Sequence, residues 1–362
     1  MIAFGLLNVY AAKHQAQLDN DLDVYAYVKK QSLAVVGGII AAVIVCLVDY
    51  RHWRDYALVL YFGTAALLAG LFVVGRRTNG AQAWYPLGGF DFQPAELAKV
   101  TLVLVLAAYI SSLPEQIHFR QFAMALAIGF LPAALVLAQP DLGTAMVMGA
   151  IVMGMLLVGG ASTRHIAVMT LLLVTLVVVV LSTGALKDYQ RARLTGFINR
   201  SATPARVTGP ISEYEQSLKG VQAQLDNTIT AIAHGGLTGT GFLKGTQTNG
   251  RFVPEQHTDF IFSAAAEQFG LVGAGGLLLC YVIIGVRIWR TATLSRDRLG
   301  TLIAVGALAM LAFHVFENVG MNLGIMPVTG IPLPFMSYGG SSTMAFLVLI
   351  GLVENVHMRR FA

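Results

Sequence analysis

One short polar stretch, residues 254–260, combines side chains that can move protons and comes just before a long apolar run. It contains Glu255, His257 and Asp259, and carboxylates and imidazoles are the usual general acids and bases of enzymes. A Thr-Asp pair that begins an apolar helix also has the form of an N-terminal cap, so Asp259 has a structural interpretation beside the catalytic one. A helix N-terminus favours the ionised carboxylate, whereas the neighbouring Glu255 or partial burial favours the protonated one.

A second charged pair, Glu96 and Lys99, lies three positions apart at the start of an expected helix, so the two side chains share a face. Charged side chains inside a membrane usually face the interior of the helix bundle. Two interpretations stay open: an internal ion pair that fixes helix packing, or an ammonium that meets an anionic headgroup while Glu96 orients it. Asp141 follows a Gln-Pro pair and precedes Gly-Thr, a pattern typical of a helix cap.

The elements that position these residues are predicted to be membrane helices. Only 12% of residues are charged, 56% are hydrophobic, and the mean hydropathy is +0.67. Apolar runs long enough to cross a bilayer lie at 32–48, 56–74, 95–112, 122–138, 143–160, 166–184, 260–286, 300–320 and 341–356. Residues 2–12 are too short to span and resemble the tail of a first helix. A signal peptide is the alternative, but no small-residue cleavage site precedes the polar run from Lys13. We therefore expect an all-α polytopic membrane protein of about ten transmembrane helices.

The placement of basic residues predicts the orientation of this bundle. If the chain starts on the inner side, its short inner loops and tail carry ten basic residues and its short outer loops carry five. The net charge of +5 then reflects topology, and no stretch has the pattern of a nucleic-acid-binding module. Cys46 and Cys280 lie within apolar runs and are expected to be packing residues, and the sequence has no His and Cys pattern typical of a metal site.

With this orientation, the unusual polar segments all emerge on the outer side. The largest is a loop at 185–259, between the seventh and eighth helices of a single domain over 1–362. Behind Ser212, apolar residues at helical spacing predict an amphipathic helix that lies on the membrane or packs on the bundle. Residues 235–250 include six glycines, which indicate a mobile loop, a close backbone approach to a ligand, or a gate.

Residues 318–342 hold three prolines and five glycines among apolar residues, so this segment cannot be an ordinary membrane helix. The string closely resembles the signature of the SEDS proteins (shape, elongation, division, sporulation), with matches at Asn318, Gly324, Pro327, Gly330 and the run 337–342. Residues 93–99 resemble the family motif Gln-Pro-Ser-Glu-Leu-x-Lys. Further family motifs follow in order at 139–144, at 188–193, at 245–247 and at 254–262. Residues 327–335 are more similar to the RodA (rod shape-determining, cell elongation) branch than to the FtsW (division) branch.

The resemblance implies a peptidoglycan glycosyltransferase, a transferase of cell wall biogenesis and cell shape that polymerises lipid II and releases undecaprenyl pyrophosphate. It implies that Asp259 is the catalytic residue and that a class B penicillin-binding protein (a transpeptidase) is the partner. The enzyme would be a multi-pass protein of the cytoplasmic (inner) membrane, with its active site facing outside. The predicted substrate-binding residues, for lipid II and the lipid-linked glycan, are Gln93, Glu96, Lys99, Gln190, Arg193, Thr246, Glu255 and His257.

Lys99 and Arg193 are the expected counter-charges for the departing pyrophosphate, with a divalent cation (Mg²⁺ or Mn²⁺) left open as a further source of positive charge. The alternative function is a transporter that flips the same lipid-linked precursor, since broken helices at a polar cavity also occur in transporters. A third is an inert scaffold for a transpeptidase. The sequence favours the enzyme because its candidate carboxylate is expected at the outer surface.

Overall fold

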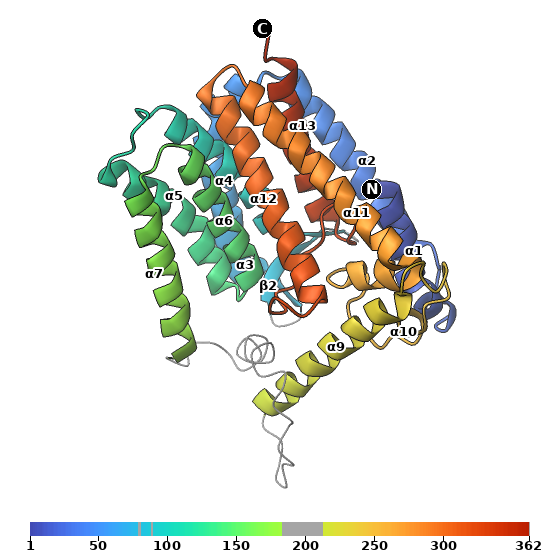
Figure 1. Cartoon of the computed structure of the whole chain (residues 1–362). Helices are drawn as coiled ribbons and strands as arrows, with labels where there is room; N and C mark the ends of the chain where they lie inside the picture. Colours follow the sequence, from blue (N-terminus) through green and yellow to red (C-terminus); the bar gives the residue numbers. More distant parts are fainter. Residues whose placement is uncertain (79–80, 88–89, 183–212, 362) are drawn as a thin grey trace. The chain divides into compact units, whose positions relative to one another are not determined.

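The computed structural model describes residues 1–78, 81–87, 90–182 and 213–361. Most of these residues are helical (Figure 1). The helices are α1 (Ile2–Leu18), α2 (Ala26–Leu47), α3 (Tyr50–Val74), α4 (Pro94–Ser111), α5 (Phe119–Ala138), α6 (Leu142–Val158), α7 (Thr163–Ser182), α9 (Glu213–Gly235), α10 (Thr246–Asn249), α11 (Ile261–Leu294), α12 (Arg298–Asn322) and α13 (Gly340–Met358).

The predicted all-α membrane architecture is confirmed. Each apolar run found in the sequence coincides with a helix. This is expected, because a helix needs about 20 consecutive apolar residues to cross the core of a bilayer. Among the described residues, seven helices are long and apolar enough to cross a membrane: α2, α3, α4, α5, α11, α12 and α13. The α6 helix is apolar but shorter. The total of ten transmembrane helices stays a prediction.

A small antiparallel sheet between α3 and α4 departs from the helical pattern. Its strands are β1 (Arg76–Thr78), β2 (Ala81–Leu87) and β3 (Phe90–Phe92), in the order β1-β2-β3. Tyr85 in β2 lies opposite Phe92 in β3, and its hydroxyl donates to the carbonyl of Leu67 in α3 at 2.9 Å. The sheet ends directly before Gln93, the residue that caps α4, so it sets the point where α4 begins.

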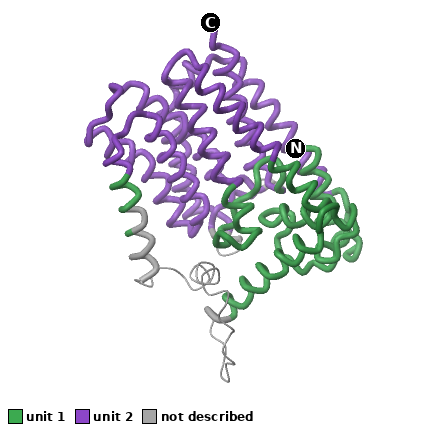
Figure 2. Tube along the Cα trace, in the orientation of Figure 1, with its two compact units in different colours: residues 1–25, 167–278, 316–337 green, residues 26–166, 279–315, 338–362 purple. Residues whose placement is uncertain are grey.

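The chain forms two compact units, shown in Figure 2. Unit 1 comprises residues 1–25, 167–278 and 316–337, and unit 2 comprises residues 26–166, 279–315 and 338–362. Each unit is assembled from segments that are distant in sequence, and α11 and α12 contribute residues to both. The single domain over 1–362 and the extracytoplasmic loop at 185–259 stay predictions.

The core of unit 2 is built around α4, which packs against α3, α5, α6 and α13. Of the apolar 18-residue stretch in α4, 78% is buried, whereas only 28% of the corresponding stretch in α2 is buried. The α4 helix is therefore central. The most extensive helix pair is α2 with α13. A Cβ added at Gly38 in α2 would lie 2.6 Å from Leu347 Cδ1, so the small residue permits the close approach of these two helices.

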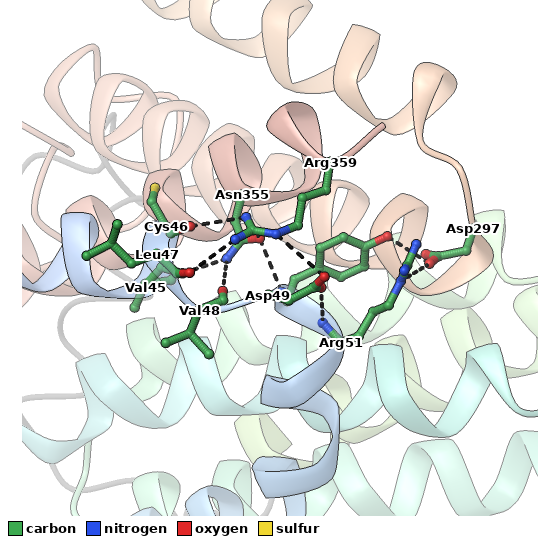
Figure 3. A network of polar contacts seen from close by, with 10 residues as sticks. Val45, Cys46, Leu47, Val48, Asp49, Arg51, Asp297, Asn355 and Arg359 are labelled. Atoms are coloured by element: carbon green, nitrogen blue, oxygen red, sulfur yellow. Dashed lines mark hydrogen bonds and ion pairs between the residues drawn. The ribbon is translucent and has the colours of Figure 1, made fainter. Parts of the chain in front are cut away.

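The end of α2 is capped by side chains of α13 (Figure 3). Asn355 Nδ2 donates to the carbonyls of Val45 and Val48, and Arg359 donates to those of Cys46 and Leu47, both at 3.1 Å. These are the carbonyls that have no partner within their own helix. These hydrogen bonds from the end of α13 therefore fix the loop between α2 and α3.

In unit 1, α9 matches the amphipathic helix expected from the sequence. Its Leu225 is fully buried with Val253, Phe260, Met321 and Val328. Of the two placements considered, packing on the protein is the one observed for this face. The helix thus contacts the segment that carries the candidate carboxylate.

The long helix α11 is broken at Gly270, whose backbone (φ 62°, ψ −164°) is not helical. The N–H groups of Leu271 and Val272 are released from the helix and donate to the carbonyls of Gly236 at 2.9 Å and Leu237 at 3.1 Å. A positive φ of this kind suits glycine. The break therefore leaves no unpaired donor at these two residues, which matters for a helix in a membrane.

Candidate functional site

A tight turn in unit 1 presents Asp259 immediately before α11. The carbonyl of Glu255 accepts the N–H groups of Thr258 at 3.2 Å, Asp259 at 3.1 Å and Phe260 at 3.4 Å. Glu255 itself has φ of 51°, a left-handed conformation that is uncommon for residues other than glycine and recurs at functional sites. The buried side chain of Phe260 anchors the turn in the core. The side chain of Asp259 is half-buried, so its carboxylate stays accessible.

Two asparagines of α12 hold the backbone of this turn. Asn318 Nδ2 donates to the Asp259 carbonyl at 2.8 Å, and Asn322 Nδ2 donates to the same oxygen at 3.2 Å. Asn322 Oδ1 accepts the Ser263 N–H at 3.1 Å, and both asparagine side chains are fully buried. Asn318, one of the matches to the family signature, is therefore a donor to the backbone of this turn. The role of Asn322 was missed, although its spacing of four from Asn318 places the two amides on one face.

The serine of the signature run completes this support. Ser337 Oγ donates to the Thr258 carbonyl at 2.5 Å and accepts the Leu333 N–H at 2.8 Å. Buried amide and hydroxyl groups thus fix the carbonyls of two successive residues, 258 and 259. The irregular Pro- and Gly-rich segment therefore positions the turn of the candidate base through its own polar side chains.

We expect Asn322→Ala to lower polymerisation about 100-fold, because a shift of about 1 Å in a catalytic group can cost that much. It should also lower the free energy of unfolding by about 0.5–1.5 kcal/mol for each hydrogen bond lost, since the buried amide bonds both the Ser263 N–H and the Asp259 carbonyl. Thermal unfolding and glycan polymerisation of the purified variant measure the two effects. Asn8→Ala is the matched control: Asn8 is equally buried but bonds within its own helix. An equal loss of activity in the control would refute the positioning role.

His257, a predicted substrate contact, is buried beside the same turn. Burial first, and the positive charge of Lys13 second, lower the pKa of His257 from 6.5 to about 3. The imidazole is therefore neutral at neutral pH and can contact a substrate only as a hydrogen-bonding group. Lys13, which is half-buried near the end of α1, is a cation that the sequence reasoning missed in this neighbourhood. Glu255 is exposed.

Acidification is expected to destabilise the protein through His257. The folded state binds this proton only near pH 3, whereas the unfolded chain binds it below about pH 6.5, so stability is lost as pH falls through that window. Between about pH 7.5 and about pH 5 the loss from this group is about 2 kcal/mol. Thermal unfolding of His257→Gln should show a correspondingly weaker pH dependence. His234→Gln, which changes an exposed histidine, should keep the full dependence; if His257→Gln keeps it too, the assignment fails.

The glycine-rich segment 235–250 makes a close backbone approach to its own chain. The N–H groups of Thr240 and Gly241 donate to the carbonyls of Glu267 at 2.9 Å and Gln268 at 3.1 Å. A Cβ at Gly239 (φ 85°) would lie 2.1 Å from the Gln268 carbonyl oxygen, so only glycine fits. Contact with α11 therefore accounts for this part of the segment without a ligand.

A buried carboxylate holds the short helix α10 in the same unit. Glu267 is fully buried and accepts the N–H groups of Gln247 at 2.7 Å and Thr248 at 2.9 Å, and the Thr248 hydroxyl at 2.6 Å. Thr246, the predicted headgroup contact, is exposed, and its hydroxyl lies 3.4 Å from Glu267 Oε1. The structure thus places Thr246 at the surface of unit 1, at the start of α10.

The second candidate group lies in unit 2, on the central helix α4. Lys99 Nζ donates to Glu96 Oε1 at 2.9 Å and lies 3.0 Å from His314 Nε2. Lys99 is fully buried and Glu96 is 2% exposed, while Glu96 Oε2 has no hydrogen-bond partner among the described residues. This geometry favours the packing interpretation of the pair. A headgroup contact of Lys99 stays a prediction.

Gln93 and Asp141 come together in unit 2. The Gln93 backbone N–H donates to Ser341 Oγ at 3.0 Å, and Gln93 Nε2 lies 3.4 Å from Asp141 Oδ2. Asp141 caps α6, since its carboxylate accepts the Thr144 N–H and hydroxyl, both at 2.9 Å. The cap expected at Asp141 is confirmed. Gln190, Arg193 and Ser212 lie outside the described residues.

The described residues contain no group of three or more His, Cys, Asp or Glu side chains arranged to hold a metal ion. A divalent cation stays a prediction.

Comparison with known proteins gives consistent matches over the whole chain. The model of the FtsW/RodA/SpoVE family, described as cell cycle proteins, matches residues 1–361. Peptidoglycan glycosyltransferase MrdB of Escherichia coli (strain K12) is 34% identical over 323 residues, 89% of this chain and 83% of the relative. The probable peptidoglycan glycosyltransferase FtsW of Geobacter metallireducens is 32% identical over 363 residues, 99% of this chain and 92% of the relative. A solved structure concerning the coordination of polymerization and crosslinking by a peptidoglycan synthase complex contains a similar chain. It has a TM-score of 0.78 and 33% identity, and the match covers 99% of this chain and 97% of that one.

Proposed function

This chain belongs to the FtsW/RodA/SpoVE family, the SEDS proteins, and we propose that as a peptidoglycan glycosyltransferase it polymerises lipid II into glycan strands. The observation that carries the proposal is the accessible Asp259 carboxylate on a turn held through its backbone. Two buried asparagines and a serine from the family signature fix that turn. A chain that needed this aspartate only as a helix cap would not need three buried side chains on the carbonyls of residues 258 and 259.

The reaction that fits this site transfers the growing lipid-linked glycan to the 4-hydroxyl of the incoming lipid-linked disaccharide. The hydroxyl oxygen forms a bond to the anomeric carbon, and the bond from that carbon to the pyrophosphate oxygen breaks. Asp259 takes the hydroxyl proton, and the bonding electrons leave with undecaprenyl pyrophosphate. A lipid pyrophosphate donor carries its own leaving group, so no nucleotide sugar is needed on the outer side of the membrane.

The departing pyrophosphate requires positive charge. Lys99 and Arg193 are the proposed counter-charges, and Lys13 is a third candidate because its charge reaches His257 beside the base. Gln93, Gln190 and Thr246 are proposed to orient the headgroups, with Glu96, Glu255 and His257 as further contacts. Among these, Thr246 and Glu255 are exposed and are therefore the most accessible to a substrate.

We place the reaction on the outer face of the cytoplasmic membrane, because the bias of basic residues puts residues 185–259 outside. A role in cell elongation follows from the similarity of residues 327–335 to the RodA branch, while a relative named FtsW matches the chain over a comparable length. The proposed partner is a class B penicillin-binding protein. A solved relative belongs to a complex that coordinates polymerization and crosslinking.

Polymerisation assays on the purified protein test the function. With a lipid-linked disaccharide as sole sugar donor, the protein should form glycan strands, and a membrane-anchored transpeptidase should increase the rate. A transporter of the same precursor would form no strands and would instead move the lipid across vesicle membranes. Translocation without polymerisation, in the presence of the partner, would replace the enzyme by the transporter.

A further inference from the structure

Unit 2 contains a cavity of about 440 Å³ that the proposed reaction does not use. It lies between the first turn of α3, the end of α4 and the start of α12. Its lining residues are Arg51, His52, Arg54, Asp55, Ser111, Asp297, Arg298 and Leu299. Three arginines in one cavity are unusual for a protein with 12% charged residues, and they call for a chemical explanation.

One of the two carboxylates in the cavity is already neutralised by protein groups. Asp297 accepts hydrogen bonds from the Tyr50 hydroxyl at 2.7 Å and the Gly300 N–H at 2.8 Å. It also accepts the N–H of Arg51 Nε at 3.3 Å (Figure 3). The capped loop between α2 and α3 fixes Tyr50, because its N–H donates to Asn355 Oδ1 at 3.1 Å. The Asp297 wall of the cavity is therefore preformed and contributes little net negative charge.

The two remaining arginines, Arg54 and Arg298, give the cavity its positive charge. Arg298 is anchored, since its guanidinium donates to the carbonyls of Leu113 and Gly159. Arg54, in the first turns of α3, is exposed and also lines the cavity. With Arg51 and Asp297 paired, the lining still contains these two guanidiniums and one further carboxylate, that of Asp55. The cavity therefore favours an anion, and planar guanidiniums match the oxygens of a phosphate.

The helix surface next to the cavity is apolar. Along α3, directly after the lining residues, the side chains of Tyr56, Leu58, Val59 and Phe62 are 60%, 60%, 69% and 59% exposed. In a membrane-spanning helix this is a hydrocarbon-facing surface. A ligand that occupies both regions needs an anionic head and an apolar tail.

We propose that this cavity binds the phosphodiester headgroup of an anionic phospholipid, whose acyl chains lie along the exposed face of α3. Basic pockets between membrane helices suit such headgroups, and basic residues near an anionic bilayer surface attract them. The site is independent of the glycosyl transfer assigned to Asp259, and it would make the stability of unit 2 depend on the lipid composition of the membrane.

Native mass spectrometry of the full-length protein with mixed phosphatidylglycerol and phosphatidylcholine tests the proposal. The protein should retain phosphatidylglycerol in preference, and Arg54→Gln should lower its affinity about fivefold, which corresponds to about 1 kcal/mol. Arg296→Gln is the matched control, because Arg296 is exposed close by in the sequence but does not line the cavity. It should leave the affinity unchanged.

Three results would overturn the proposal. Equal retention of the two lipids would show that the headgroup charge is not recognised. Equal losses in Arg54→Gln and Arg296→Gln would show diffuse surface attraction. Complete displacement of phosphatidylglycerol by the same concentration of soluble glycerol phosphate would show a site for free phosphate groups, because the acyl chains would then contribute nothing.

Discussion

Asp259→Asn is expected to lower the rate of glycan polymerisation by about 10²- to 10⁴-fold, the usual contribution of a general base. Asparagine keeps the size of the side chain and removes its basicity. Folding should change by less than about 1 kcal/mol, because asparagine is as good a helix cap as aspartate. The contacts that hold the turn are also unaffected, since Asn318 and Asn322 bind the backbone carbonyl of residue 259.

The comparison with Glu255→Gln sharpens this prediction. Glu255 is an exposed carboxylate four residues earlier in the same turn, and it is proposed only as a substrate contact. Its neutralisation should therefore affect the apparent KM more than the rate of the chemical step. Polymerisation by Asp259→Asn at a rate close to that of the unmodified protein would exclude Asp259 as the base. Equal rate losses in the two variants would also argue against a special role for Asp259.

Lys99→Met is expected to lower the free energy of unfolding by about 3–5 kcal/mol, because it leaves the buried Glu96 carboxylate without its counter-charge. The pair is 2.9 Å apart and almost completely buried, and Glu96 Oε2 already lacks a partner among the described residues. Thermal unfolding in detergent measures this loss. It would be small if Lys99 contributed only through a substrate headgroup.

The double variant Glu96→Gln/Lys99→Met separates packing from substrate binding. Removing both charges should restore most of the stability, since no buried carboxylate remains uncompensated. If activity stays low although the stability of the double variant is restored, the ammonium of Lys99 contributes to the reaction as proposed. If stability and activity both recover, Lys99 serves packing alone.

The positions of the helices could be predicted because hydropathy has a direct physical cause in the thickness of the bilayer. The amphipathic helix α9 was equally accessible, since the spacing of its apolar residues reports one buried face. The sheet at 76–92 was missed because its strands are as short as three residues and lie in a Gly- and Pro-containing stretch. Such strands depend on pairing rather than on local propensity.

The candidate site was predictable in its residues and less so in its supports. Asp259 was identified from a motif, whereas the bonds from Asn318 and Asn322 join positions 59 and 63 residues apart, and no local pattern reveals such pairs. The glycines of 235–250 suggested a ligand or a gate because the sequence does not say which backbone approaches them. The structure shows that the backbone of α11 is the one that approaches them.

The break at Gly270 has a mechanical consequence. Backbone bonds join α11 to the segment 236–241 on both sides of this non-helical residue. Glu267 and Gln268 accept the N–H groups of Thr240 and Gly241, and Leu271 and Val272 donate to Gly236 and Leu237. A straight helix of 34 residues would act as a lever, so that a small tilt of its far end would displace the residue at its start. The interruption, with bonds on both of its sides, weakens that lever. A change in bilayer thickness that tilts the far end is expected to act first on these bonds, so that the carboxylate of Asp259, ten positions before residue 269, keeps its alignment.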